Sequence, residues 1–110
     1  MGSLDNPPAL KFTPINTATF TIAAGAAGWV DTDVSATTGT DVTKLWLVTS
    51  STVTQQDAGV RPLGEASAPL GITNGTVSFL SYCGLTGHME FYRNAISNVD
   101  YRLLGYLRND

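Results

Sequence analysis

Apolar side chains in this chain recur at every second position, and no segment shows the 3.6-residue spacing of an amphipathic helix. In segment 42–51, Leu45 and Leu47 alternate with Trp46 and Val48. Because successive side chains of a strand point to opposite faces, this period indicates β-structure. Both alternating sets are apolar here, so we expect a central strand that is covered on both faces.

The same period predicts further strands, which are separated by stretches rich in Gly, Pro, Asn and Thr. They are two short extended pieces around Phe12 and Phe20, followed by segments 29–34, 60–63, 76–83, 88–93 and 101–108. About seven or eight short strands, with turn signals at regular spacing, are typical of an antiparallel sandwich or barrel. The chain is therefore predicted to be all-β, without substantial helix.

The length of 110 residues fits one domain. We expect residues 10–110 to form it and residues 1–9, which contain Pro7 and Pro8, to be an extended N-terminal arm. Residues 1–3 are read as a cloning remnant and carry no weight in the fold prediction. Neither a signal-peptide pattern nor an apolar run of about 20 residues is visible, so no membrane insertion is expected.

Charged residues make up only 14% of the chain, where about 25% is usual. The shortage suggests that another copy or another protein covers part of the surface, although a neutral Thr/Ser/Asn-rich surface would give the same figure. The net charge of −3 and the lack of a basic stripe argue against nucleic-acid binding. A single cysteine, Cys83, excludes an internal disulfide and a cysteine-based zinc site.

Catalytic machinery is not expected. Nucleophilic catalysis needs a base beside the nucleophile, and the one histidine is His88. A Cys83–His88 pair across a short turn is conceivable, but a free cysteine is more often a small buried hydrophobe. Asp31 and Asp33 share a strand face near Asp41, and such oxygens attract calcium. A solvated strand face or turn-capping role is favoured, so the prediction is no catalytic residue, no metal and no cofactor.

Five residues are candidates for contact with a ligand or partner. They are Trp29, Asp31, Arg61, His88 and Tyr92. Trp29 follows Gly28 at a strand start and is the best candidate for exposure. Arg61 lies between glycines; we favour a structural pair with Asp31 or Asp33 and keep a contact across a subunit interface as the alternative. His88 is expected to face solvent in a hairpin, with a ligand contact as the alternative.

A second group of residues is a candidate oligomer interface, because large apolar groups occur on both faces of their strands. These residues are Trp46, Tyr101, Leu104 and Tyr106. Aromatic side chains with polar tips are favoured at interfaces, and for each aromatic residue core or interface packing is favoured over sugar stacking. Gly105 is expected to let a neighbouring backbone or aromatic ring approach closely.

Three parts of the chain carry a family resemblance: residues 28–35 (GWVDTDVS), 58–64 (AGVRPLG), and 89–92 (MEFY) followed by 100–106 (DYRLLGY). Their order resembles small jelly-roll-like β domains of bacteriophage virion proteins. In that group a Trp-x-Asp strand, a Gly-Val-Arg-x-x-Gly segment and a terminal Tyr-Leu-x-Gly-Tyr strand recur. The terminal element departs slightly here, since Leu103 and Leu104 precede Gly105.

The resemblance, which spans residues 28–107, implies an antiparallel jelly-roll-like β-sandwich that serves as a head decoration, fibre or tail receptor-binding domain. Such parts are often trimers, so a homo-oligomer, favoured as a trimer, is expected in the virion after synthesis in the host cytoplasm. Other virion proteins and host-surface glycans are the expected partners. The alternative hypothesis is a carbohydrate-binding module, motivated by the tryptophans, tyrosines and polar loops.

Overall fold

The computed structural model describes residues 10–52, 56–64, 73–74, 77–84 and 86–108. The expected arm, residues 1–9, lies outside these ranges. The strands are β1 (Lys11–Ile22), β2 (Gly28–Asp33), β3 (Leu45–Thr52), β4 (Asp57–Ala58), β5 (Val60–Pro62), β6 (Thr73–Asn74), β7 (Val77–Tyr82), β8 (His88–Arg93) and β9 (Val99–Arg108), with one helical turn, α2 (Ser35–Thr38).

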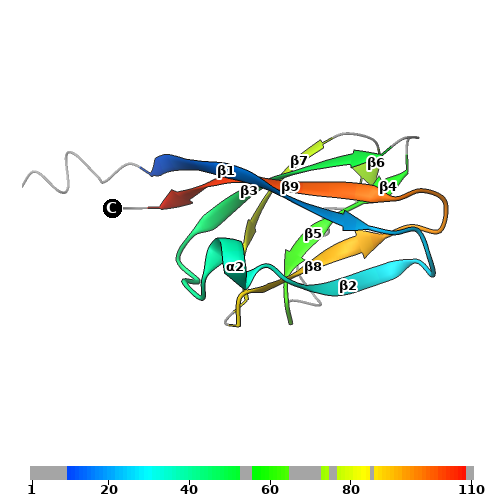
Figure 1. Ribbon diagram of the computed structural model, residues 1–110, viewed down its shortest axis with the longest axis horizontal. Helices are drawn as coiled ribbons and strands as arrows, with labels where there is room; N and C mark the ends of the chain where they lie inside the picture. Colours follow the sequence, from blue (N-terminus) through cyan, green and yellow to red (C-terminus); the bar gives the residue numbers. More distant parts are fainter. Residues whose placement is uncertain (1–9, 53–55, 65–72, 75–76, 85, 109–110) are drawn as a thin grey trace, which may run out of the picture.

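The strands form two stacked layers (Figure 1). The large sheet has the order β1-β9-β3-β7, and the small sheet has the order β2-β8-β5. A two-stranded pair, β4-β6, completes the structure. Neighbouring strands are antiparallel throughout. Along the chain β1, β2, β3, β5, β7, β8 and β9 alternate between the large and the small sheet, which is the wrapping of a jelly roll. The predicted all-β jelly-roll-like sandwich is confirmed.

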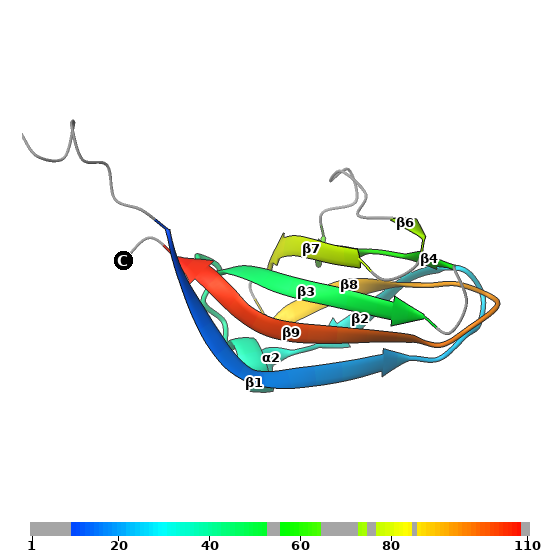
Figure 2. The ribbon, with the colours of Figure 1, turned by 90° about the horizontal axis from the view of Figure 1, so that it is seen from above.

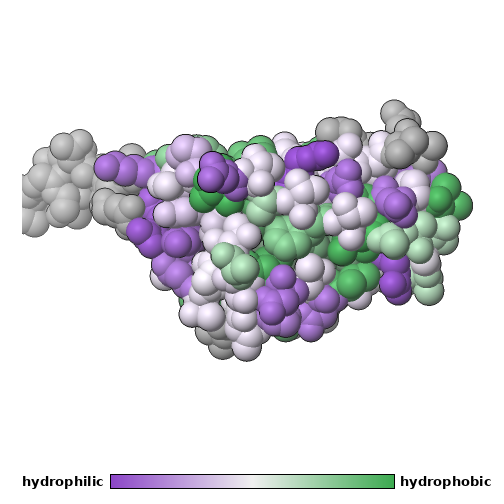
Figure 3. Space-filling view, viewed as in Figure 1, coloured by the Kyte–Doolittle hydropathy of each residue, from purple (hydrophilic) through white to green (hydrophobic). Residues whose placement is uncertain are grey.

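The core lies between the two sheets, as strand alternation requires. The large sheet contributes Trp46, Val48, Tyr101 and Leu103, and the small sheet contributes Met89 and Phe91, all buried. The rings of Phe91 and Tyr101 stack at 4.4 Å between centroids and 8° between planes. In the space-filling view of Figure 3, hydrophobic residues on this side of the molecule gather along the seam between the layers.

Two local expectations change in the structure. The two pieces expected around Phe12 and Phe20 are one strand, β1, with a register shift between Pro14 and Ala18. The turn after Val34 contains the helical turn α2, which starts where Asp33 Oδ1 accepts hydrogen bonds from the amide (2.9 Å) and hydroxyl (2.6 Å) of Ser35. Such side-chain hydrogen bonds to the local backbone favour turns.

Gly105 is where β1 packs most closely on β9. A β-carbon at this position would lie 2.4 Å from the carbonyl oxygen of Thr13 and 2.6 Å from the ring of Phe12. The predicted close approach of a backbone and an aromatic ring is confirmed. Because Gly105 has no side chain, the long strand β1 packs directly against β9 at the edge of the large sheet.

Strand β3 is central, between β9 and β7, as expected. The expected cover on both faces is not found within the protomer. Trp46 and Val48 are buried in the core, whereas Leu45 and Leu47 lie on the outer face and are only partly buried. Among the described residues, no element packs over this outer face (Figure 2). Leu45 and Leu47 therefore belong to the surface of the protomer.

Candidate functional site

The outer face of the small sheet collects polar and aromatic side chains from three strands. Inward-pointing Val30, Val60 and Phe91 pack in or against the core, so the alternate residues of β2, β5 and β8 point outward. We call this outward set the small-sheet face: Trp29, Asp31, Asp33, Arg61, His88, Glu90 and Tyr92. The structure thus brings all five predicted ligand- or partner-binding residues onto one surface.

Arg61 forms the centre of this face. Its Nε lies 2.7 Å from Glu90 Oε1, and the two side chains are only 12% and 16% exposed. The guanidinium carbon lies 4.2 Å from the ring centroid of Trp29, whose ring meets Tyr92 edge-on at 5.4 Å. A flat guanidinium suits both a carboxylate and an aromatic face.

The favoured pairing of Arg61 with Asp31 or Asp33 is wrong, because the register places Glu90 directly opposite Arg61 on the neighbouring strand β8. Asp31 and Asp33 lie one strand further away, on β2. The expected exposure of Trp29 is also reduced. The ring is half-buried because Arg61 and Tyr92 pack against it.

His88 is paired with a carboxylate rather than directed freely into solvent. Its Nδ1 lies 2.6 Å from Asp31 Oδ1, its Nε2 lies 3.9 Å from Asp33 Oδ2, and the side chain is 28% exposed. The hydrogen bond with Asp31, supported by the charges of Asp31 and Asp33, raises the pKa of His88. Hydrogen bonds from Ser35 lower the pKa of Asp33. The positive charge of His88 on this side of the small-sheet face therefore persists to a higher pH than that of an ordinary histidine.

Cys83 is a buried hydrophobe, as predicted, with 3% of its surface exposed. Its sulfur lies 3.4 Å from Thr38 Oγ1 and 3.6 Å from the backbone carbonyl oxygen of His88. Burial raises the pKa of the thiol, which disfavours the nucleophilic thiolate. The structure places the backbone of His88, and not its imidazole, against the sulfur.

The acidic residues considered for a cation are engaged with the protein. Asp31 pairs with His88, and Asp33 accepts hydrogen bonds from Ser35. Asp41 accepts hydrogen bonds from Thr43 and Arg108. Within the described ranges, no three His, Cys, Asp or Glu side chains are grouped so that they could hold a metal ion. The helical turn α2, the one helix in that part of the chain, is far too short to cross a membrane.

The predicted oligomer-interface residues do not form one surface. Trp46 and Tyr101 are 1% and 0% exposed, so their assignment to an interface is corrected: they belong to the core. Tyr106 also points inward, with its ring 5.0 Å from that of Trp46. Leu104 is partly buried at the β9 irregularity, where the pairing with β3 passes from Gly105 to Leu103. The alternation of side chains along a strand shows which residues share a face, but it does not show which face points into the core.

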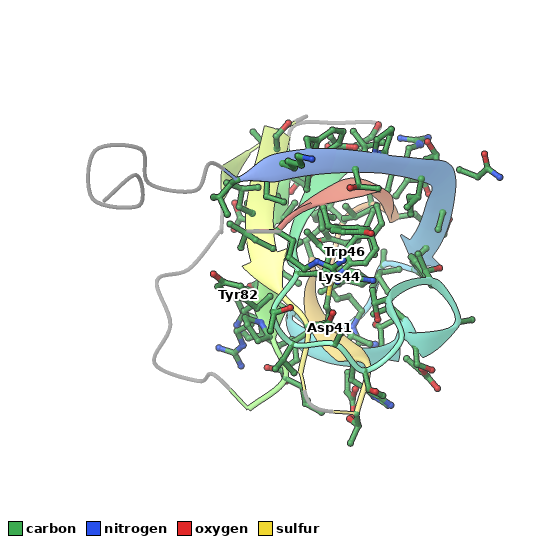
Figure 4. All side chains as sticks on the ribbon, turned by 90° about the vertical axis from the view of Figure 1, so that its left-hand side faces the viewer. Asp41, Lys44, Trp46 and Tyr82 are labelled. Carbon is green, nitrogen blue, oxygen red and sulfur yellow. The ribbon has the colours of Figure 1, made fainter. Side chains whose placement is uncertain are left out.

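The surface that could form an interface is the other face of the same strands. Two rows of opposite residues run across the four strands of the large sheet: Phe12–Leu107–Leu45–Tyr82 and Pro14–Gly105–Leu47–Leu80. Phe12, Leu80 and Tyr82 are 47%, 55% and 49% exposed. We call Phe12, Pro14, Leu45, Leu47, Leu80, Tyr82 and Leu107 the apolar patch. Figure 2 looks onto this sheet, and Figure 4 shows Tyr82 at the outside of the molecule.

The apolar patch ends sharply along the sheet. The next rows on the same face are Thr19–Arg102–Thr49–Ser78 and Thr21–Asp100–Ser51. Asp100 accepts a 2.6 Å hydrogen bond from Thr21 and lies 3.6 Å from Arg102. The alternation alone puts Leu80 and Tyr82 on one face of β7, but only the β3–β7 pairing adds them to Leu45 and Leu47.

Two surfaces on opposite sides of the sandwich are thus available for function, the apolar patch and the small-sheet face. No family model, no curated protein and no solved structure matches this chain.

Proposed function

We propose that this chain is a non-enzymatic structural protein of a bacteriophage particle, a decoration, fibre or tail-tip domain that acts in assembly or host attachment. The apolar patch is the observation that carries the proposal. It presents large apolar side chains from all four strands of the large sheet without a charged residue among them. Contiguous exposed apolar surface of this kind marks an interaction site.

A second copy of this chain is the partner that suits the apolar patch. The patch needs a surface that is equally uncharged, and another copy supplies one. Most soluble oligomers are built from identical chains with closed symmetry. The low proportion of charged residues, 14%, agrees with a surface that is partly covered. The resemblance to phage virion domains favours a trimer.

The fold supports the same proposal by analogy. Jelly rolls of two antiparallel sheets are used by viral capsid and lectin domains. A fold alone does not specify a function, so the analogy adds weight only together with the apolar patch and the sequence resemblance. In this proposal the protein resides in the virion.

The test is the solution mass from light scattering on a size-exclusion column, from low to high micromolar concentration. The wild type is expected to be a trimer at all concentrations. Leu80→Lys places a charge in the apolar patch and is expected to give a monomer. The matched control, Ser78→Lys, lies on the same face of β7 in the polar rows and should leave the trimer intact. A monomeric wild type, or an unchanged Leu80→Lys oligomer, would overturn the proposal.

A second candidate function is carbohydrate binding, which is favoured by the grouping of Trp29, Tyr92 and Arg61 with three acidic residues on the small-sheet face. Aromatic rings and hydrogen-bonding side chains together suit a sugar. The test is a glycan-array screen of the wild type and Trp29→Ala, with Tyr82→Ala as an aromatic control on the other sheet. Carbohydrate binding is supported if the wild type and Tyr82→Ala bind a glycan on the array and Trp29→Ala does not. It is rejected if the wild type binds no glycan.

A further inference from the structure

One end of the sandwich holds a group of aromatic and cationic side chains on the inner side of the large sheet. Trp46 on β3 and Tyr106 on β9 are opposite each other in the register, and their rings lie 5.0 Å apart. The ammonium of Lys44 lies 4.4 Å from the ring centroid of Tyr106 and 6.0 Å from that of Trp46. Figure 4 shows Lys44 beside Trp46 at this end, with Asp41 near them.

The indole N–H of Trp46 is the unusual feature of this group. The side chain is 1% exposed, and Nε1 has no hydrogen-bond acceptor among the residues that the structure describes. An indole nitrogen can only donate. A buried donor without an acceptor destabilises the fold, and native proteins retain few of them. The position therefore calls for an acceptor from outside the described chain.

Lys44 supplies a positive charge beside that donor. Within the described ranges its ammonium has no carboxylate within 4.0 Å, and its contacts are the two aromatic rings. The nearby Asp41 is occupied: Oδ1 accepts from the amide and hydroxyl of Thr43, at 2.9 and 2.6 Å, and Oδ2 accepts from Arg108 at 3.0 Å. The Thr43 hydrogen bonds also lower the pKa of Asp41, so it stays ionised and engaged.

We infer that Lys44, Trp46 and Tyr106 form a binding site for the carboxylate of a small acidic ligand. One carboxylate oxygen accepts the indole N–H of Trp46, and the carboxylate pairs with the ammonium of Lys44. A charged acceptor fits better than a neutral one, because hydrogen bonds in which one partner is ionised are about twice as strong as those between neutral groups. The ammonium of Lys44 lies over the ring of Tyr106 at the end of a flexible stem, and in this inference the movement of that stem lets the carboxylate reach the indole N–H.

This site is separate from both surfaces of the proposed function. The apolar patch lies on the outer face of the large sheet, and the small-sheet face belongs to the other layer. The inference does not depend on self-association or on binding at Trp29. Failure of the oligomer experiment and failure of the carboxylate experiment are therefore independent results.

The experiment is an NMR titration that follows the two indole N–H resonances, assigned with Trp29→Phe. The probes are sodium acetate and sodium glucuronate, with glucose as the neutral counterpart of the sugar and sodium chloride to match ionic strength. The Trp46 resonance is expected to shift downfield and saturate with both carboxylates, while the Trp29 resonance stays in place. A lower half-saturation concentration for glucuronate than for acetate would show that the sugar ring also contacts the protein.

Lys44→Met tests the cation, because methionine keeps an unbranched apolar stem and removes the charge. The half-saturation concentration should rise about tenfold or more. The control, Lys11→Met, removes a lysine at the start of β1 and should bind as the wild type does. Thermal melting confirms that both variants are folded. The inference is overturned by a stationary Trp46 resonance, by an equal response to glucose, or by unchanged binding in Lys44→Met.

Discussion

The hydroxyl of Tyr101 in the large sheet donates a 2.6 Å hydrogen bond to the backbone carbonyl of Tyr92 in the small sheet. The same hydroxyl accepts a 3.2 Å hydrogen bond from the amide of Gly59. Between these partners the ring of Tyr101 stacks on Phe91. One fully buried side chain therefore joins the two layers by packing and by two polar contacts.

Replacement of this hydroxyl should weaken the sandwich without changing its shape. Tyr101→Phe keeps the stacked ring but leaves the carbonyl of Tyr92 and the amide of Gly59 without this partner. We expect the free energy of unfolding to fall by about 1–3 kcal/mol, as measured by urea denaturation. Tyr82→Phe, whose side chain is 49% exposed on the outer face of β7, is the control and should be nearly neutral. An equally stable Tyr101→Phe protein would refute the layer-joining role.

The burial of the Tyr101 hydroxyl also leads us to expect a loss of stability at alkaline pH. Burial raises the pKa of Tyr101 from its ordinary value of 10.0 to about 12. A raised folded-state pKa means that the contribution is complete below pH 10 and is lost as the pH rises towards 12. Urea denaturation at about pH 9 and about pH 11 should therefore show a larger decline in the wild type than in Tyr101→Phe. An equal decline in the free energy of unfolding of the two proteins would contradict the raised pKa of Tyr101.

The His88–Asp31 pair leads us to expect a loss of stability as the pH rises through the raised pKa of His88. Because Asp31 raises the pKa of His88 above its ordinary 6.5, the pair stabilises the fold fully below pH 6.5 and loses this effect as the pH rises through the folded-state value. Asp31→Asn should lower the His88 pKa in an NMR titration of the imidazole. Asp100→Asn, on the large sheet, should leave that titration unchanged. A His88 pKa that is insensitive to Asp31→Asn would show that the pair does not form.

The close approach at Gly105 predicts a steric penalty. In Gly105→Ala the new methyl group would meet the backbone of Thr13 and the ring of Phe12, so β1 must shift away from β9. Overpacking of this kind costs about 1–3 kcal/mol, measured by thermal or urea denaturation. Adding Phe12→Ala should restore only part of the loss, because the Thr13 carbonyl remains. Full stability in Gly105→Ala would mean that β1 adjusts freely.

Arg61 and Trp29 should be energetically coupled. The guanidinium lies over the indole at 4.2 Å, and such contacts contribute about 0.5–2 kcal/mol depending on solvent exclusion. A double-mutant cycle of Arg61→Gln and Trp29→Leu is expected to give a coupling energy in that range. The control cycle pairs Trp29→Leu with Arg102→Gln on the other sheet and should be additive. Additivity in both cycles would count against the contact.

The sequence was most informative where local geometry decides the outcome. Alternation in 88–93 predicted the strand β8 with its observed bounds, His88–Arg93. The fate of Cys83 and the close contact at Gly105 also followed from residue chemistry, since a small apolar thiol favours the core and glycine admits a close neighbour. The absence of a helical period predicted an all-β domain, and the short turn α2 begins where the Asp33 carboxylate accepts hydrogen bonds from Ser35.

Sites that depend on pairing between distant strands were less predictable. The prediction that Arg61 pairs with Asp31 or Asp33 is wrong because Glu90 becomes its neighbour only through the β5–β8 register. The interface prediction for Trp46 and Tyr101 is wrong because both faces of their strands carry large apolar residues, and only the structure shows that these two side chains point into the core. The apolar patch joins residues as far apart in the chain as Phe12 and Tyr82, which meet through β9 and β3.

By itself, the sequence determined the β-period, the strand count within narrow bounds, and the two sets of side chains that each strand presents. The tertiary structure alone decided which set of each strand points inward, which strands are neighbours, and hence where Leu45, Leu80 and Phe12 gather on the surface. The physical reason is that alternation is a local consequence of the pleated backbone, whereas face and register are fixed by the burial of whole strands against one another.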